Sequence, residues 1–199
     1  QCLYITLIDQ NAGIINDPIL LKLGEDHFWL SIADSDVLLW AKGLSLGCGF
    51  DVMVDEPDVS PLAVQGPKAE LLMEKVFGTI VRKIRFFQFN TVDFKGNPLH
   101  VSRSGFSRQG GFEIYLDKSS LGIDLWDTLW EAGQEFNVAP GYSNLVERVE
   151  GGLLSYGNEM TLANNPMECN LDRYCCLDGS LDYIDREVLQ SIAEIGPTQ

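Results

Sequence analysis

Short apolar runs, broken every few residues by turn-forming residues, are the feature that most constrains the fold of this chain. Three such runs occupy residues 3–8, 14–23 and 27–33, and clusters rich in Asp, Asn and Gly separate them. Pro18 interrupts the second run, and because proline cannot donate to a sheet ladder, the strand lies at an edge or is bulged there. Short strands with tight turns between them predict an antiparallel meander.

Helical periodicity alternates with these strands. A helix is expected to begin at Asp34 or Ser35 and to end near Leu46. Later segments predict helices near 67–77, 119–136, 144–154 and 183–194. Further strands are expected at 50–54, 61–65, 90–94, 98–103 and 112–116. Because several strand pairs are hairpins, we predict an α+β fold with two sub-domains of mostly antiparallel sheet and packed helices.

Breaks in composition suggest where these sub-domains end. The turn-forming sequence Glu56-Pro57-Asp58 marks one boundary, and the chain becomes polar and rich in turns after Ser155. We therefore expect a small α+β sub-domain over 1–57, a second one over 58–160, and a connecting tail over 161–199. The chain opens on what reads as the middle of a strand, so it is expected to be part of a longer protein.

The charge balance limits the possible partners. Against 29 Asp and Glu there are 14 Lys and Arg, which leaves a net charge of −15. This surface repels phosphate groups, so neither nucleic acid nor an anionic membrane is expected as a partner. No apolar run approaches the roughly 18–20 residues of a membrane-spanning helix. A cationic or neutral small ligand suits this field better.

Cysteine and histidine usage indicates a reducing, cytoplasmic location and no metal. Five cysteines, an odd number without a CxxC spacing, are typical of free thiols. The two histidines, His27 and His100, lie far from the cysteine group in the sequence, whereas a zinc site needs about four such ligands.

Asp17 is the first candidate functional residue. Pro18 holds the residue before it in extended geometry, and apolar residues flank this acidic position on both sides. Such a carboxylate can serve a buried site, or it can simply face water from the polar side of a half-buried strand. The residue pattern alone leaves both interpretations open.

A glycine-rich loop and the strand after it form the second candidate. Residues 104–111 combine glycines with Phe106 and Arg108, and the next strand carries Glu113 and Tyr115 on one face. A carboxylate beside an aromatic ring suits a flat heterocycle, because the carboxylate accepts two parallel N–H bonds while an aromatic ring packs on the plane. An ordinary hairpin with a polar outer face explains the pattern equally well.

Read in order, four segments resemble the aminomethyltransferase family, the T-protein of glycine cleavage and its relatives. The matching segments are Asn11–Asp17, Ala63–Ala69, Ser102–Glu113, and Arg148–Glu150 followed by Leu154–Met160. Asn16-Asp17-Pro18, where the T-protein has two aspartates and no proline, is most similar to the dimethylsulfoniopropionate demethylase branch. The resemblance implies a T-protein-like folate-binding fold, with residues 58–160 as the folate-binding sub-domain. It also implies that an N-terminal segment and a C-terminal barrel are missing.

The resemblance further implies a role for individual residues. Asp17 matches the catalytic aspartate near the folate, Glu113 matches the glutamate that grips the pterin, and Tyr115 and Phe106 line the same pocket. Asn144 stands where the family has a folate-binding arginine, which argues against glycine cleavage.

The implied activity is transfer of a one-carbon unit to tetrahydrofolate, with a small-molecule methyl or aminomethyl donor. Dimethylsulfoniopropionate or a similar compound is the first candidate donor. The alternatives are a glycine-cleavage aminomethyltransferase, which takes its unit from a lipoyl carrier protein, and a non-catalytic folate-binding protein.

Overall fold

The computed structural model describes residues 1–32, 36–142 and 145–196, and the chain divides into two compact units. Unit 1 comprises Gln1–Cys2 and Glu56–Leu153, and unit 2 comprises Leu3–Asp55 and Leu154–Gln199. Unit 2 is therefore built from two separate stretches of the chain. Both units mix helices with antiparallel strands, which confirms the predicted α+β class.

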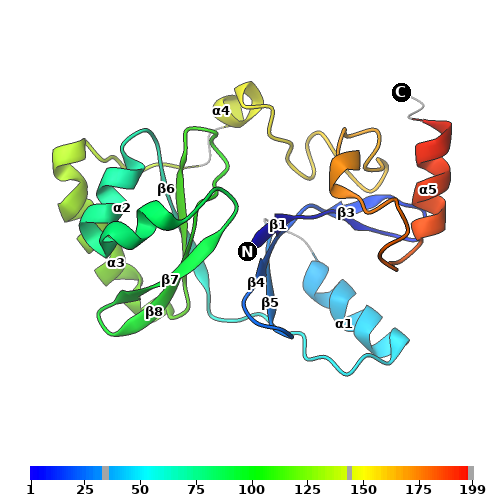
Figure 1. The fold of residues 1–199 in the computed structure, drawn as a ribbon, viewed down its shortest axis with the longest axis horizontal. Helices are drawn as coiled ribbons and strands as arrows, with labels where there is room; N and C mark the ends of the chain where they lie inside the picture. The colour runs from blue at the N-terminus through cyan, green and yellow to red at the C-terminus, as the bar shows by residue number, and fades with distance from the viewer. Residues whose placement is uncertain (33–35, 143–144, 197–199) are drawn as a thin grey trace. The chain divides into compact units, whose positions relative to one another are not determined.

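A four-stranded antiparallel sheet forms the centre of unit 1 (Figure 1). Its spatial order is β6-β9-β8-β7. The strands are β6 (Ser60–Gln65), β7 (Phe89–Phe94), β8 (Asn97–Ser102) and β9 (Gly111–Leu116). Helices α2 (Ala69–Phe77) and α3 (Gly122–Gly133) lie beside this sheet, and α4 (Leu145–Glu150) follows later in the chain. Short 3₁₀ turns complete the unit at Thr79–Lys83, Ser119–Leu121 and Gln134–Phe136.

The alternation of side chains along β9 separates the core of unit 1 from its opposite face. Phe112, Ile114 and Leu116 are buried in one apolar cluster with residues of α2 and α3. Because successive side chains of a strand point to opposite faces, Glu113 and Tyr115 lie on the face away from this cluster. The cross-strand partners on that face include Ala63 opposite Glu113 on β6. The core therefore fixes which way the candidate carboxylate points.

Unit 2 contains the shorter strands, although Cys2, the first residue of the first strand, is grouped with unit 1. A three-stranded sheet has the order β1-β4-β5, and a ribbon pairs β2 with β3. The strands are β1 (Cys2–Tyr4), β2 (Leu7–Ile8), β3 (Ile14–Asn16), β4 (Ile19–Lys22) and β5 (Phe28–Ser31). Its helices are α1 (Val37–Cys48) and α5 (Arg186–Ile195), with a 3₁₀ turn at Asp172–Tyr174. Asp17 and Pro18 thus join the ribbon to the sheet, at the break that the proline predicts.

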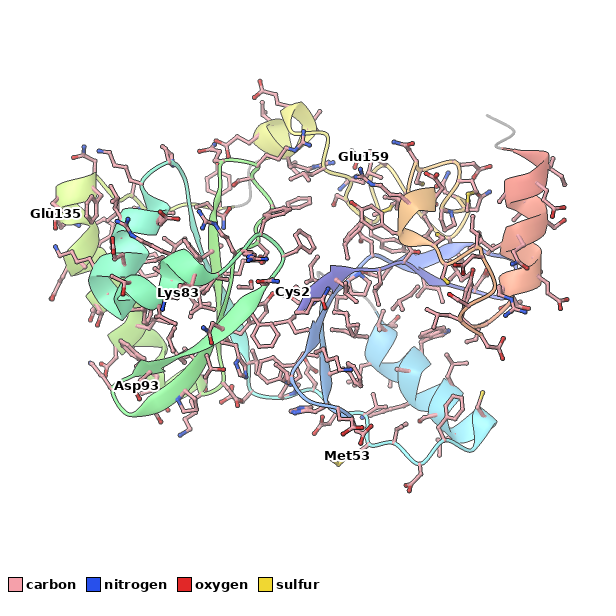
Figure 2. The ribbon with its side chains drawn as sticks, in the orientation of Figure 1. Cys2, Met53, Lys83, Asp93, Glu135 and Glu159 are labelled. Carbon is pink, nitrogen blue, oxygen red and sulfur yellow. The ribbon has the colours of Figure 1, made fainter. Side chains whose placement is uncertain are left out.

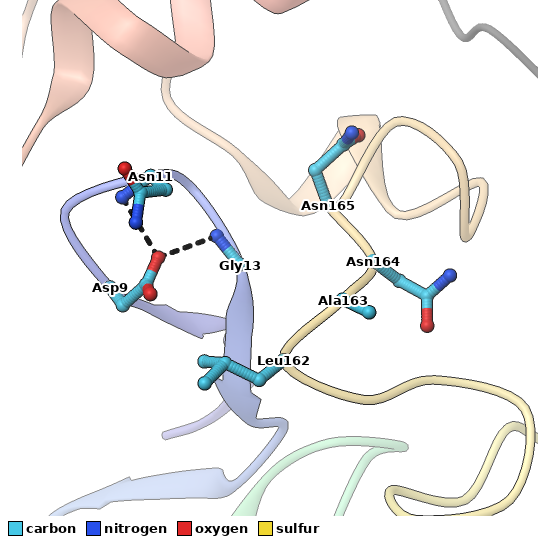
Figure 3. Close-up of a pocket in the computed structure, with 7 residues that line it drawn as sticks. All are labelled: Asp9, Asn11, Gly13, Leu162, Ala163, Asn164 and Asn165. Carbon is cyan, nitrogen blue, oxygen red and sulfur yellow. Dashed lines mark hydrogen bonds between the residues drawn. The ribbon is translucent and has the colours of Figure 1, made fainter.

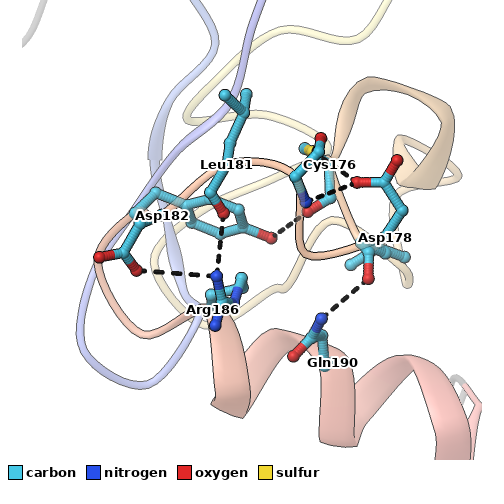
Figure 4. A network of polar contacts seen from close by, with 9 residues as sticks. Cys176, Asp178, Leu181, Asp182, Arg186 and Gln190 are labelled. Atoms are coloured by element: carbon cyan, nitrogen blue, oxygen red, sulfur yellow. Dashed lines mark hydrogen bonds and ion pairs between the residues drawn. The ribbon is translucent and has the colours of Figure 1, made fainter.

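The last segment of the chain packs with the first. Leu189 of α5 is buried with Ile8 and Ala12, and Met167 and Leu177 pack against the same cluster. A polar network supports the loop before α5 (Figure 4). In it the Tyr183 hydroxyl donates to the Cys176 carbonyl at 3.0 Å, and Gln190 donates to the Leu177 carbonyl at 2.8 Å. Residues 161–199, expected as a connecting tail, are thus grouped with residues 3–55.

Three sequence expectations differ from the observed elements, and one lies outside the described residues. The three runs expected to form a meander give five strands in two sheets, with β1 beside β4 and β2 beside β3. Residues 50–54 form no strand, and Met53, labelled in Figure 2, is 88% exposed. Helix α4 ends at Glu150, because Gly151 and Gly152 close a turn there. The expected helix start at Asp34 or Ser35 falls among residues that are not described. In the described parts of the chain, no helix has the length and hydropathy needed to cross a membrane.

Candidate functional site

Asp17 sits between β3 and β4 of unit 2 and is held by its neighbours. The Tyr4 hydroxyl donates a hydrogen bond to Asp17 Oδ2 at 2.7 Å. The backbone N–H of Asp17 donates to Asn16 Oδ1 at 2.8 Å. The ring of Tyr4 packs edge-on against Tyr174, with 4.7 Å between ring centroids. Asp17 is therefore a half-buried, oriented carboxyl group and not a solvated one.

Burial and hydrogen bonding act in opposite directions on Asp17. Burial raises the pKa of Asp17 above its usual value, because desolvation disfavours the charged form, and the hydrogen bond from Tyr4 offsets part of this rise. Burial, together with the adjacent carboxylate, raises the pKa of Tyr4 as well. Tyr4 therefore remains a neutral donor at neutral pH and favours the ionised form of Asp17.

Glu113 of unit 1 is held by a pair of buried serines. Ser104 Oγ donates to Glu113 Oε2, and Ser102 Oγ is hydrogen-bonded to Ser104 Oγ. Burial raises the pKa of Glu113, and the bond from Ser104 lowers it in part. Burial also raises the pKa of the neighbouring Cys2 thiol to about 11, so this group is uncharged at neutral pH. Glu113 is thus an acceptor whose charge is supported by hydroxyl groups.

The loop between β8 and β9 is fastened by Gln65. Gln65 Nε2 donates to the carbonyls of Ser104 and Phe112, both at 3.1 Å, and its Oε1 accepts from Ser107 Oγ at 2.8 Å. A Cβ at Gly105 would lie 2.1 Å from the Gln65 side chain, and φ at Gly105 is +157°. Glycine at this position therefore lets the amide of Gln65 approach the loop closely.

The structure brings three of the four predicted site residues into one unit. Glu113 and Tyr115 share a face of β9, and Phe106 lies in the loop that leads into that strand. Tyr115 is buried, whereas Phe106 is 40% exposed. Asp17 belongs to unit 2 and is described there separately. Asn144, the position that departs from the family's arginine, is outside the described residues.

Unit 2 also contains a polar hollow of about 320 Å³ that none of the predicted site residues lines (Figure 3). Asp9, Gly13 and the segment Leu162–Asn165 form its wall. The Asp9 carboxylate accepts from the N–H groups of Asn11 at 2.9 Å and Gly13 at 2.8 Å. These hydrogen bonds stabilise the turn between β2 and β3, so the Asp9 carboxylate at this hollow has a structural role.

Among the described residues, no group of three or more His, Cys, Asp or Glu side chains is arranged to hold a metal ion. All five cysteines carry free thiols.

Sequence reasoning missed the residues that hold the two carboxyl groups. Tyr4 precedes Asp17 by thirteen positions, and Ser104 precedes Glu113 by nine. Neither spacing is a periodic one, so no local pattern reveals these pairs. Gln65 lies within the Ala63–Ala69 family motif, and membership of that motif is the sequence feature that could have pointed to its role in holding the loop.

Comparison with protein families identifies the class. Residues 1–179 match the GCVT N-terminal domain, and the chain belongs to this family. It is 51% identical over all 199 residues to the dimethylsulfoniopropionate demethylase DmdA of Ruegeria pomeroyi, 54% of which it covers. The aminomethyltransferase of Thermoanaerobacter sp. strain X514 is 30% identical over 202 residues, which cover 98% of this chain and 54% of that protein.

A solved structure has the same fold. The glycine cleavage system aminomethyltransferase T from Bartonella henselae superposes with a TM-score of 0.82 and 23% identity. The match covers 100% of this chain and 54% of that one. The predicted family resemblance and the T-protein-like fold are thereby confirmed. The chain spans about half the length of the curated relatives that it matches.

Proposed function

We propose that this chain is part of a tetrahydrofolate-dependent methyltransferase that demethylates dimethylsulfoniopropionate or a similar donor. The observation that carries the proposal is the 51% identity to the Ruegeria pomeroyi demethylase along the whole chain, against 30% to the Thermoanaerobacter aminomethyltransferase. The net charge of −15 also suits a donor with a cationic sulfonium centre. The free thiols support a cytoplasmic location.

The residues of unit 1 fit the proposed cofactor. A carboxylate can accept about four hydrogen bonds, and Ser104 uses one of these positions, on Glu113 Oε2. Most of the hydrogen-bond acceptor positions of Glu113 are therefore left for a ligand. An amino-pyrimidine edge with parallel N–H groups would use these positions. The half-exposed ring of Phe106 offers a stacking surface, and Tyr115 adds a buried wall on the face of Glu113. When bound, tetrahydrofolate supplies the nitrogen that accepts the one-carbon unit.

Asp17 is proposed to orient the reactants. With a sulfonium donor, the carbon–sulfur bond to the methyl group would break as a carbon–nitrogen bond to the folate acceptor forms. A neutral thioether would leave with the electron pair of the broken bond, and the proton of the acceptor nitrogen would pass to solvent. Positive charge spreads out in that transition state, so an environment with little water favours it. A carboxylate fixed by Tyr4 can hold the cationic sulfonium centre of the donor in line, and alignment is worth roughly 7–11 kcal/mol in favourable cases. Asp17 therefore needs no nucleophilic role.

A product assay on the full-length protein tests this function. The protein is incubated with tetrahydrofolate and dimethylsulfoniopropionate, and formation of 5-methyl-tetrahydrofolate is the expected result. The variant Asp17→Asn is expected to retain folate binding and to lose most turnover. Asp26→Asn, at an exposed turn of the same unit, is the matched control and should behave as wild type. Unchanged turnover in Asp17→Asn refutes the role of Asp17.

The second candidate is an aminomethyltransferase that acts on a lipoyl-bound aminomethyl group. The identity to the Thermoanaerobacter aminomethyltransferase favours it. In that case the same assay, with an aminomethylated lipoyl carrier protein as donor, yields 5,10-methylene-tetrahydrofolate. The product therefore separates the two candidates.

A further inference from the structure

The two serines behind Glu113 are themselves almost completely withdrawn from solvent. Ser102 is 0% exposed and Ser104 is 5% exposed. Ser102 lies directly opposite Glu113 in the β8–β9 ladder, on the face away from the core. Ser104 follows two residues later, where the chain leaves β8. Both hydroxyl groups thus lie on the protein side of the carboxylate.

The direction of these hydrogen bonds follows from the proton count. An ionised carboxylate can only accept, so Ser104 must give its single hydroxyl proton to Glu113 Oε2. The Ser104 oxygen is then free to accept from Ser102 Oγ, whose single proton has the Glu113 carbonyl oxygen at 3.5 Å as a longer and weaker alternative acceptor. The chain of hydrogen bonds therefore runs from Ser102 through Ser104 to the accepting Glu113 carboxylate, and only Glu113 carries a charge. Hydrogen bonds in such a chain polarise and strengthen one another.

Ser104 is held in place independently of Glu113. Its carbonyl accepts from Gln65 Nε2 at 3.1 Å, and Gly105 next to it leaves room for the Gln65 amide. The backbone of Ser104 is thus anchored to the end of β6. A hydroxyl fixed in this way can impose an orientation on the longer and more flexible side chain of Glu113.

We propose that Ser104, supported by Ser102, is the positioning residue that orients the Glu113 carboxylate toward a ligand with parallel N–H donors. This inference rests on the proposed function, because it explains how Glu113 would select the amino-pyrimidine edge of the proposed folate. Without the Ser104 hydroxyl, the Glu113 side chain would lose conformational freedom only when the ligand binds, which weakens binding. Burial would also disfavour the ionised carboxylate, which is the form that accepts two N–H hydrogen bonds from the ligand.

Binding and kinetics of serine variants of the full-length protein test the proposal. Calorimetry with tetrahydrofolate under anaerobic conditions should show roughly ten- to hundred-fold weaker binding for Ser104→Ala, the range for loss of a hydrogen bond to a charged group. Ser104→Thr keeps the hydroxyl and should restore most of the affinity. Ser102→Ala should give a smaller loss in the same direction. Ser60→Ala, at an exposed position of the same sheet, is the matched control.

The kinetic pattern distinguishes positioning from general damage. For Ser104→Ala the KM for tetrahydrofolate should rise while kcat at saturating tetrahydrofolate stays close to wild type, and the circular dichroism spectrum should show that the variant is folded under the assay conditions. Wild-type affinity in Ser104→Ala overturns the proposal. So does a Ser104→Thr variant that is as weak as Ser104→Ala.

A separate measurement tests the positioning role of Ser104 even if the proposed function is wrong. If the wild-type protein binds no tetrahydrofolate, the proposed function is refuted. Crystal structures of wild type and Ser104→Ala then decide the positioning role alone. A Glu113 carboxylate that changes rotamer in the variant supports the role, and one that keeps its place overturns it.

Discussion

Replacing Gln65 by leucine tests how the loop that carries Phe106 is held. The leucine side chain has a similar volume, but it removes three hydrogen bonds, to the carbonyls of Ser104 and Phe112 and from the hydroxyl of Ser107. Each such bond contributes about 0.5–1.5 kcal/mol net. Since Gln65 is half-buried and water can replace some of the lost partners, we expect a loss near the lower end of the combined range, about 2 kcal/mol.

Two measurements on the full-length protein check this value. Urea unfolding followed by circular dichroism gives the loss of unfolding free energy, and hydrogen exchange should become faster at the amides of residues 104–111. Gln109→Leu is the control, because Gln109 is exposed in the same loop and surface changes stay within about 0.5 kcal/mol. Equal losses in both variants, or unchanged exchange in the loop, would refute the idea that Gln65 fastens it.

Three further predictions concern single contacts. In Tyr4→Phe, Asp17 loses the hydrogen bond that offsets its burial, so its pKa rises further and the acidic limb of the pH profile of methyl transfer moves to higher pH. In Gly13→Ala, the new Cβ would lie 2.3 Å from the carbonyl oxygen of Leu162, and urea unfolding should show a loss of about 1–3 kcal/mol. In Glu113→Gln, urea unfolding at pH 7 should show higher stability than wild type, while calorimetry shows weaker folate binding. Burial raises the pKa of Glu113, so the protonated form contributes to the unfolding free energy at low pH. This contribution is lost as the pH rises through the folded-state pKa. A glutamine amide does not ionise, so the variant undergoes no such loss.

Each of these three has its own control. Tyr142→Phe, at a residue that is 90% exposed, should leave the pH profile unchanged, and an unchanged profile in Tyr4→Phe as well would contradict the first prediction. Gly43→Ala lies within α1 with open space around the new Cβ, and it should stabilise by about 0.5–1 kcal/mol. The gain in Glu113→Gln should shrink at a pH where the wild-type carboxyl is also neutral. A gain that is independent of pH would contradict the linkage.

Local signals predicted the sheet of unit 1 well. The hairpin β7–β8 was placed within a residue or two, because the Lys95-Gly96 turn and the apolar alternation around it are both readable in the sequence. Residues 50–54 show the limit of this reasoning. Their alternating apolar residues look like a strand, yet Val52 and Met53 are more than half exposed. Whether a strand finds a partner depends on distant residues, and no local pattern contains that information.

The candidate site likewise has residues that the sequence predicts and residues that it does not. Asp17 could be singled out because an acidic residue with apolar neighbours on both sides is unusual, and Glu113 because it shares a strand face with Tyr115 after a glycine-rich loop. The family motifs contain both residues. Their hydrogen-bonding partners could not be singled out, since Tyr4 and Ser104 reach them through strand register and loop geometry. The roles of all four predicted residues in binding or chemistry are predictions, and the variants of Asp17 and Glu113 described above test two of them.

Unit 2 is assembled from two stretches of chain that are separated by most of unit 1. During synthesis, the ribosome therefore delivers every residue of unit 1 before the buried Leu189, which packs against Ile8, has been made. Unit 1 can fold while the peptide is still growing, but the early strands of unit 2 must wait with apolar surface uncovered. A released chain that ends at residue 153 should accordingly protect residues 56–153 from protease and leave residues 3–55 open to cleavage.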